Sequence, residues 1–437
     1  MKKVFLTVVG FSMLCRFSAN AQLKHDSTIK KANFSLYTPV GYDTSDYRPR
    51  RLRVDEIDIF SSYYNQDGQH SAVTGGNGTE KVTDISNGVN LNLVWLDQAL
   101  RKNTLSLGLG LDHHTSASSG YIALKGGANE GGSRIYPSID WSIEDSKKGS
   151  TFGLGAYYSH EYNYQSLGFD VNWAQKTADK NGELGIKLQG YFDQVTQILP
   201  SEFVPPPTYI PPGSTTYTTP SGQTIITSTT GKTISAPLTY KPRTTLTAAF
   251  SYSQIINSKL QIMFLGDLVY QNGDLGLPFH RVYFKGGKDT IETLPSTRIK
   301  LPIGIRANYF LGDNIVLRSY YRYFIDNWGV SAHTINLETV YKINPFFSVS
   351  PFYRFYTQTA SKYFAPYEQH LATDQFFTSN YEYSKFNSQF FGAGIRLAPP
   401  KGVFGIQNLH ELELRYGHYI TTEQLSSNVI SLSLGFK

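Results

Sequence analysis

The residue types best suited to chemistry are few in this chain, and the most conspicuous are two adjacent histidines. Asp112, His113 and His114 follow one another, and carboxylate and imidazole groups are common ligands of transition metals. Adjacent side chains of an extended strand point to opposite faces, so the two imidazoles cannot reach one ion, and no cysteine lies nearby. We therefore interpret them as polar residues at a strand end, and we predict no metal site and no cofactor.

Three acidic residues form a second candidate group. Asp55, Glu56 and Asp58 carry the oxygen ligands that hard cations prefer. Four arginines lie just upstream of them, so we interpret the acids as charges that face a lumen or its rim. The glycine-rich run 75–78 lacks the Lys-Ser/Thr pair of a phosphate-binding loop, and no spacing of Ser, His and acid indicates a catalytic triad. We expect no enzyme.

The strongest functional pattern is a set of arginines in the last third of the chain, each placed among apolar residues at alternate positions. Some glutamates share this alternation. The arginines are Arg306, Arg318, Arg322, Arg354, Arg396 and Arg415, and the glutamates are Glu338, Glu411 and Glu413. Two interpretations are open: the charges form a salt-bridged ladder that stiffens the protein, or the arginines form an anion-attracting constriction of the kind that lines some pores.

Strands are the elements that place such charges on one face, and the sequence predicts many of them. In segment after segment every second residue is apolar or aromatic, and clusters of Gly, Asn, Asp, Pro and Ser separate the segments. One clear example contains Leu105, Leu107, Leu109 and Leu111. We count about sixteen such strands, an even number of the kind found in bacterial membrane barrels.

The lengths of the connections decide between a soluble β-sandwich and a membrane barrel, since alternation alone fits both. Every second connection is short, whereas the other set holds the long insertions. These long insertions span residues 63–84, 115–133, 198–243, 272–297 and 358–385. Short periplasmic turns and long external loops are typical of outer-membrane barrels. We therefore predict an all-β fold, a transmembrane antiparallel β-barrel, located in the outer membrane of a Gram-negative bacterium.

The composition agrees with this class and excludes others. Of the 437 residues, 17% are charged and 14% are aromatic, which is unlike a disordered chain. No segment beyond the N-terminus has the roughly 20 consecutive apolar residues of a membrane helix. The chain is therefore expected to cross the membrane with strands.

The N-terminus is typical of a secretory signal peptide, with Lys2 and Lys3 before an apolar stretch and Ala19 and Ala21 as small residues at the cleavage site. We predict a signal peptide over residues 1–21. Its removal takes away the single cysteine and lowers the formal charge from +6 to +3 through the loss of two lysines and Arg16. A charge this small does not indicate nucleic-acid binding.

The mature chain divides into two predicted parts. Residues 22–51 form a periplasmic N-terminal segment, and residues 52–437 form the barrel. Within the barrel, residues 198–243 are rich in Pro and Thr, which predicts an extended or mobile external loop. The chain ends in an alternating strand that resembles the targeting strand recognised by barrel-insertion machinery. Its apolar positions are Ile430, Leu432, Leu434 and Phe436.

The stretch from Val54 to Asp84, which begins VDEIDIFSSYYNQDGQHSAVTGG, resembles the N-terminal signature of a family of Gram-negative exported proteins of unknown function. The segment LGLDHHTSASS at residues 109–119 belongs to the same resemblance. Members are similar in having a signal peptide and outer-membrane strands. The resemblance implies a barrel and supplies no activity. It also implies a loose association with exported redox and flavin-attachment systems.

Two classes of function follow from these patterns. The first is a porin-like pore or translocation channel of unknown substrate with a partly basic lumen. The second is a structural or scaffolding barrel that recruits envelope partners, with a link to exported redox or flavin-attachment systems. In either case the expected partners are outer-membrane lipid, the barrel-insertion machinery and other envelope proteins.

Overall fold

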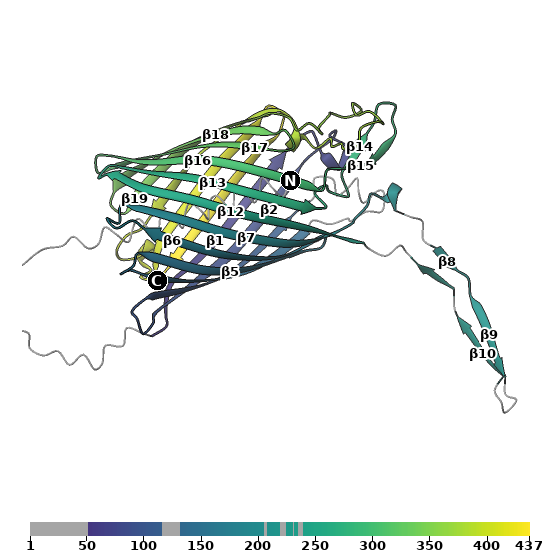
Figure 1. The fold of residues 1–437 in the computed structure, drawn as a ribbon, viewed down its shortest axis with the longest axis horizontal. Coiled ribbons are helices and arrows are strands. Elements are labelled where there is room, and N and C mark those ends of the chain that lie inside the picture. Colours follow the sequence, from purple (N-terminus) through teal and green to yellow (C-terminus); the bar gives the residue numbers. More distant parts are fainter. Residues whose placement is uncertain (1–50, 116–131, 205–207, 219–223, 230, 235–238) are drawn as a thin grey trace, which may run out of the picture. The chain divides into compact units, whose positions relative to one another are not determined.

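The computed structural model describes residues 51–115, 132–204, 208–218, 224–229, 231–234 and 239–437. Sixteen antiparallel strands close into one barrel (Figure 1). Each barrel strand pairs with the next one along the chain, and the last pairs with the first, as in the pairing of Tyr63 with Ile430. The predicted fold class is therefore confirmed. The signal-peptide prediction, with Ala19 and Ala21, lies outside the described residues.

The barrel strands have the following bounds: β1 Arg53–Asp67, β2 Val82–Leu96, β3 Lys102–His114, β4 Gly132–Asp145, β5 Ser150–Glu161, β6 Tyr164–Lys176, β7 Gly182–Thr196, β12 Tyr240–Asn257, β13 Leu260–Gly273, β16 Thr297–Leu311, β17 Ile315–Asp326, β18 Ser331–Asn344, β19 Phe347–Gln358, β20 Phe386–Leu397, β21 Leu409–Thr421 and β22 Ser426–Phe436. The connections contain short 3-10 helices, η2 Ala72–Thr74, η3 Ser201–Phe203, η4 Tyr381–Tyr383 and η5 Val403–Gly405. None of the helices in the described ranges is long and apolar enough to cross a membrane.

Alternation explains both the strands and their two faces. In β3, Leu107, Leu109 and Leu111 are 37%, 47% and 50% exposed, whereas Asp112, which follows Leu111 and points to the other face, is 8% exposed. Apolar side chains that cover the outside of a closed barrel suit acyl chains, and polar side chains then line the inside. Closure also leaves no unpaired strand edge, which a membrane would not tolerate.

The two ends of the barrel differ in the lengths of their connections, as the sequence predicts. One end carries short turns, which we call the short-turn end; the other carries the long connections and is called the long-loop end. At the short-turn end, Gly312 reverses the chain with a φ of 64°, a left-handed conformation that glycine adopts without strain. The side chain of Asn344 accepts hydrogen bonds from the backbone N–H groups of Phe346 and Phe347, both at 2.9 Å, and so fixes another turn.

The connection between β7 and β12 contains the Pro/Thr-rich segment. Its described part forms two small antiparallel ladders, in which β8 Thr208–Ile210 pairs with β11 Lys232–Ile234 and β9 Gly213–Thr218 pairs with β10 Thr224–Thr229. These ladders were not predicted from the sequence. Threonine, isoleucine and tyrosine favour strands, so this segment has a strand propensity in spite of its low-complexity composition.

Candidate functional site: two charged walls of the lumen

Contacts between strands that are not neighbours show which side chains point into the barrel. The Nη1 atom of Arg415 on β21 lies 3.1 Å from Oε1 of Glu338 on β18, although β19 and β20 separate these strands in the sheet. The two side chains can meet only across the concave inner surface. Arg415 also lies over the ring of Phe352 on β19, 4.9 Å from its centroid. These residues therefore line the lumen.

Three of the predicted arginines pair with the predicted glutamates. Besides its contact with Glu338, Arg415 lies 3.3 Å from Glu413. Arg396 donates a 2.8 Å hydrogen bond to Glu411, and Arg318 lies 3.7 Å from Glu338. Glu338 thus lies within ion-pair distance of both Arg318 and Arg415, so ion pairs connect β17, β18 and β21 in this part of the wall.

The other three arginines differ from these. Arg306 stacks over Tyr320 at 5.7 Å, and Arg354 over Phe390 at 4.9 Å. Arg322 donates a 3.5 Å hydrogen bond to Thr334, while its buried Nε atom has no hydrogen-bond partner. Within the described residues none of these three arginines forms an ion pair. Asp267 on β13 interacts electrostatically with Arg322 but forms no ion pair with it within the described residues. Together the six arginines on β16–β21 make up what we call the basic wall.

A row of aspartates lines the other side of the barrel. Each alternates with exposed apolar neighbours such as Leu111, Ile139 and Phe169, so it points inward. We call this row, on β2–β7, the acidic wall. Its members are Asp84, Asp112, Asp140, Asp170 and Asp193.

The acidic wall is held by a dense set of short contacts. Asp193 accepts a 2.9 Å hydrogen bond from Arg243, and Asp170 lies 3.3 Å from Lys187. The Tyr157 hydroxyl lies 2.6 Å from Asp140 and also contacts Asp170. Hydroxyl groups and cations thus surround the carboxylates close to the strands.

The order of the strands places the two walls opposite each other. In the closed ring of sixteen strands, β2 and β16 are eight positions apart, and so is each following pair up to β7 and β21. Strands separated by half of a ring face each other across the lumen. The inner surface is therefore basic on one side and acidic on the other. The acidic wall was not predicted, although the alternation that indicates the arginines also indicates Asp112, Asp140 and Asp170.

The remaining candidate residues have ordinary structural contacts. His113 hydrogen-bonds Ser133 at 2.9 Å, whereas His114 lies 3.5 Å from Glu161. Glu56 lies 3.0 Å from His410. Within the described part of the chain, no group of three or more His, Cys, Asp or Glu residues could hold a metal ion.

The long-loop end contains a packed cluster that sequence reasoning did not find. Val282, Phe284 and Phe377 form an apolar core between two connections. The side chain of Arg281 is fully buried; it donates hydrogen bonds of 2.5 and 3.1 Å to Glu202 and one of 2.7 Å to the backbone oxygen of Val73. One guanidinium thus ties three separate connections together, and we call this group of residues the loop cluster.

Two buried carboxyl groups in the connections of the long-loop end have shifted pKa values. Burial alone would raise the pKa of the Glu292 carboxyl, but His280, the Thr378 hydroxyl and the Leu277 N–H together lower it. Burial, with a smaller contribution from Glu382, raises the pKa of Glu80 to about 7. The buried Glu292 carboxylate thus accepts hydrogen bonds, as buried polar groups of protein cores generally do.

Solved structures with similar folds are membrane barrels. A BenF-like porin from Pseudomonas fluorescens Pf-5 is 7% identical, with a TM-score of 0.40 over 88% of this chain and 98% of that one. The loop L8 deletion mutant of OmpT from Vibrio cholerae is 8% identical, with a TM-score of 0.41 over 88% and 99%. A ferric enterobactin receptor mutant from Pseudomonas aeruginosa is 12% identical, with a TM-score of 0.44 over 84% and 53%. At this level we transfer no function.

No curated protein matches the chain. A family model described as "Protein of unknown function (DUF3570)" matches residues 131–426, which include most of the barrel and the whole basic wall. The N-terminal signature around residues 54–84 precedes the matched range, so that part of the resemblance stays a prediction. The chain belongs to the DUF3570 family.

Proposed function

We propose that the protein is a passive channel for small charged solutes, with an anion preference set by the basic wall. The observation that carries this proposal is the set of three lumen arginines, Arg306, Arg322 and Arg354, that form no ion pair within the described residues. An arginine that faced lipid at mid-depth would cost about 2 to 4 kcal/mol. In a wet lumen the same charge is hydrated and attracts anions.

The distinction between paired and unpaired arginines makes the proposal specific. Arg318, Arg396 and Arg415 have carboxylates within ion-pair distance, so their fields are partly cancelled. Arg306, Arg322 and Arg354 have no carboxylate within ion-pair distance among the described residues. We therefore assign the anion preference to the unpaired set.

Conductance across a planar bilayer tests the proposal. The purified full chain should give stepwise currents, and a salt gradient should give a reversal potential of the sign expected for anion preference. The double variant Arg322→Ala with Arg354→Ala should lose most of that preference. The matched control, Arg322→Lys with Arg354→Lys, keeps both charges and should retain it. Absence of any conductance would contradict the channel function. An unchanged reversal potential in the alanine variant would contradict the assignment of anion preference to Arg322 and Arg354.

The scaffolding alternative is favoured by a different observation, the loop cluster. Because Arg281 joins connections through Glu202 and Val73, it stabilises a defined surface at the long-loop end that an envelope protein could recognise. A barrel that stays closed in the bilayer and co-purifies with a defined envelope protein would favour this function over the channel.

We infer that the protein lies in the outer membrane after cleavage of residues 1–21, with the short turns in the periplasm. The apolar exterior of the closed barrel supports this inference. Sucrose-gradient fractionation and N-terminal sequencing of the mature chain test it, and a mature chain that begins at Gln22 is the expected result. Recovery of the protein in the inner-membrane or soluble fraction would overturn it.

A further inference from the structure

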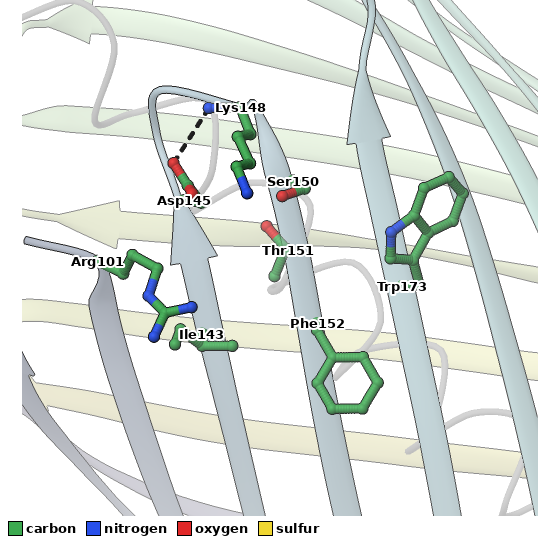
Figure 2. Close-up of a pocket in the computed structure, with 8 residues that line it drawn as sticks. All are labelled: Arg101, Ile143, Asp145, Lys148, Ser150, Thr151, Phe152 and Trp173. Atoms are coloured by element: carbon green, nitrogen blue, oxygen red, sulfur yellow. Dashed lines mark hydrogen bonds between the residues drawn. The ribbon is translucent and has the colours of Figure 1, made fainter. Parts of the chain in front are cut away.

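A pocket of about 170 Å³ opens on the outer face of the barrel at the short-turn end (Figure 2). Its lining includes Arg101, Ile143, Asp145, Lys148, Phe152 and Trp173. Arg101 lies in the turn between β2 and β3, and Lys148 in the turn between β4 and β5. The pocket therefore lies where the apolar exterior meets the charged turns.

The wall of the pocket is apolar and continuous with the exterior of the barrel. Ile143 pairs with Phe152, and Phe152 pairs with Trp173, so three neighbouring strands present these side chains side by side. Phe152 and Trp173 are each 39% exposed. Aromatic rings at this height are typical of the membrane interface, and their exposed faces would contact the upper part of an acyl chain.

The rim of the pocket carries both signs of charge. Arg101 forms a 2.7 Å ion pair with Asp97 but is 45% exposed, and a guanidinium has five N–H donors, so donors remain for a ligand. The exposed Lys148 forms no ion pair within the described residues. Asp145 uses one carboxylate oxygen, Oδ1, for the backbone N–H groups of Lys147 and Lys148. Figure 2 shows these side chains at the turns, with Phe152 and Trp173 further along their strands.

We propose that this pocket binds the headgroup of a zwitterionic glycerophospholipid, phosphatidylethanolamine. The phosphate lies against Arg101 and Lys148, where charge-assisted hydrogen bonds are strong. The primary ammonium donates to Asp145, and the acyl chains follow Phe152 and Trp173. Phosphatidylglycerol is anionic and has no ammonium group, so its phosphate would repel Asp145 with no cation of the lipid to compensate. Phosphatidylcholine has a quaternary ammonium, which has no N–H to donate to Asp145.

This site is independent of whether the lumen conducts. It requires only that the barrel exterior contacts lipid and that the short turns lie at a phospholipid leaflet. Because we predict that the short turns face the periplasm, the leaflet concerned is the inner leaflet of the outer membrane, which consists of phospholipid.

Native mass spectrometry of the full chain in a non-ionic detergent tests the proposal. Phosphatidylethanolamine, phosphatidylcholine and phosphatidylglycerol with identical acyl chains are titrated separately. We expect one phosphatidylethanolamine to bind more tightly than either of the others. The variant Arg101→Ala with Lys148→Ala should bind it about tenfold more weakly, and Asp145→Asn should shift the preference from phosphatidylethanolamine toward phosphatidylglycerol.

Two controls separate a specific site from general effects. Lys259→Ala removes a cation from another turn, between β12 and β13, and should leave binding unchanged. The heat-dependent shift of each variant on SDS gels shows whether the barrel is folded. Equal lipid binding by wild type and by the folded Arg101/Lys148 variant, or equal binding of all three lipids by the wild type, would overturn the proposal.

Discussion

The basic and acidic walls are built from the same strand pattern, yet they present their charges differently. On the acidic wall, Asp193 and Arg243 form a pair whose side chains are 4% and 14% exposed. On the basic wall, Arg318 is 44% exposed although it also has an acidic neighbour. An aspartate is short and stays close to the strands, where hydroxyls and cations enclose it. An arginine has a long stem that carries its charge away from the wall.

This difference indicates which wall a solute meets. A charge enclosed by partners contributes to the stability of the barrel, and its field in the lumen is largely cancelled. A charge that extends into water acts on passing ions over about 8 to 10 Å at physiological salt. We therefore expect substitutions on the basic wall to change ion selectivity, and those on the acidic wall to change stability.

Charge reversal on the basic wall should give the largest change in selectivity. Arg322→Glu combined with Arg354→Glu replaces two unpaired positive charges by two negative ones. The reversal potential in a salt gradient should change sign, from anion to cation preference. Asn336 on β18 pairs with Arg354 and lies two positions from Thr334, the partner of Arg322, so Asn336→Gln serves as a neutral control in the same region. Retained anion preference in the folded double variant would show that the basic wall does not set the ion selectivity.

Removal of a shared acid should give a smaller change in the opposite direction. Glu338→Gln takes away the carboxylate that faces both Arg318 and Arg415. One charge at about 4 Å in water is worth about 1 kcal/mol, so the permeability ratio should shift toward anions by up to about fivefold. The reversal potential in a salt gradient measures this shift in the permeability ratio. A shift toward cations would mean that Glu338 does not compensate the arginines in the open channel.

The sequence predicted the barrel because alternation, turn chemistry and loop lengths each depend on local residues. The alternation that places Leu107 and Leu109 on one side indicates a strand with one apolar and one polar face. Only a few fold architectures contain many such strands. The pairing of β1 with β22 follows from the need to close the sheet. The six arginines were found for the same reason, since side-chain parity is a local property.

Long-range partners could not be found in this way. Arg281 and Glu202 are 79 residues apart, and nothing in their neighbourhoods predicts that they meet in the loop cluster. Which arginines are paired also depends on register across several strands, as the contact between Arg415 and Glu338 shows. The pocket at Arg101 and Lys148 likewise combines two turns with three strands. These features require the folded barrel.

Substitution on the acidic wall should change selectivity least. Asp193→Asn leaves Arg243 without its carboxylate partner at 2.9 Å, and it weakens the acceptor of a 2.7 Å hydrogen bond from Ser166. Removal of one member of a buried ion pair costs about 3 kcal/mol or more, so the free energy of unfolding in detergent should fall by about that amount. The reversal potential should stay close to the wild-type value, because the Tyr164 ring still covers the Arg243 guanidinium.

The matched variant Asp193→Asn with Arg243→Met removes both charges and should recover part of the lost stability, since no buried charge is then left alone. Urea unfolding and reversal potentials measured on the same preparations separate the two effects. If Asp193→Asn changes selectivity as strongly as the double reversal at Arg322 and Arg354, the acidic wall faces the solute as openly as the basic wall, and the distinction drawn from side-chain length fails.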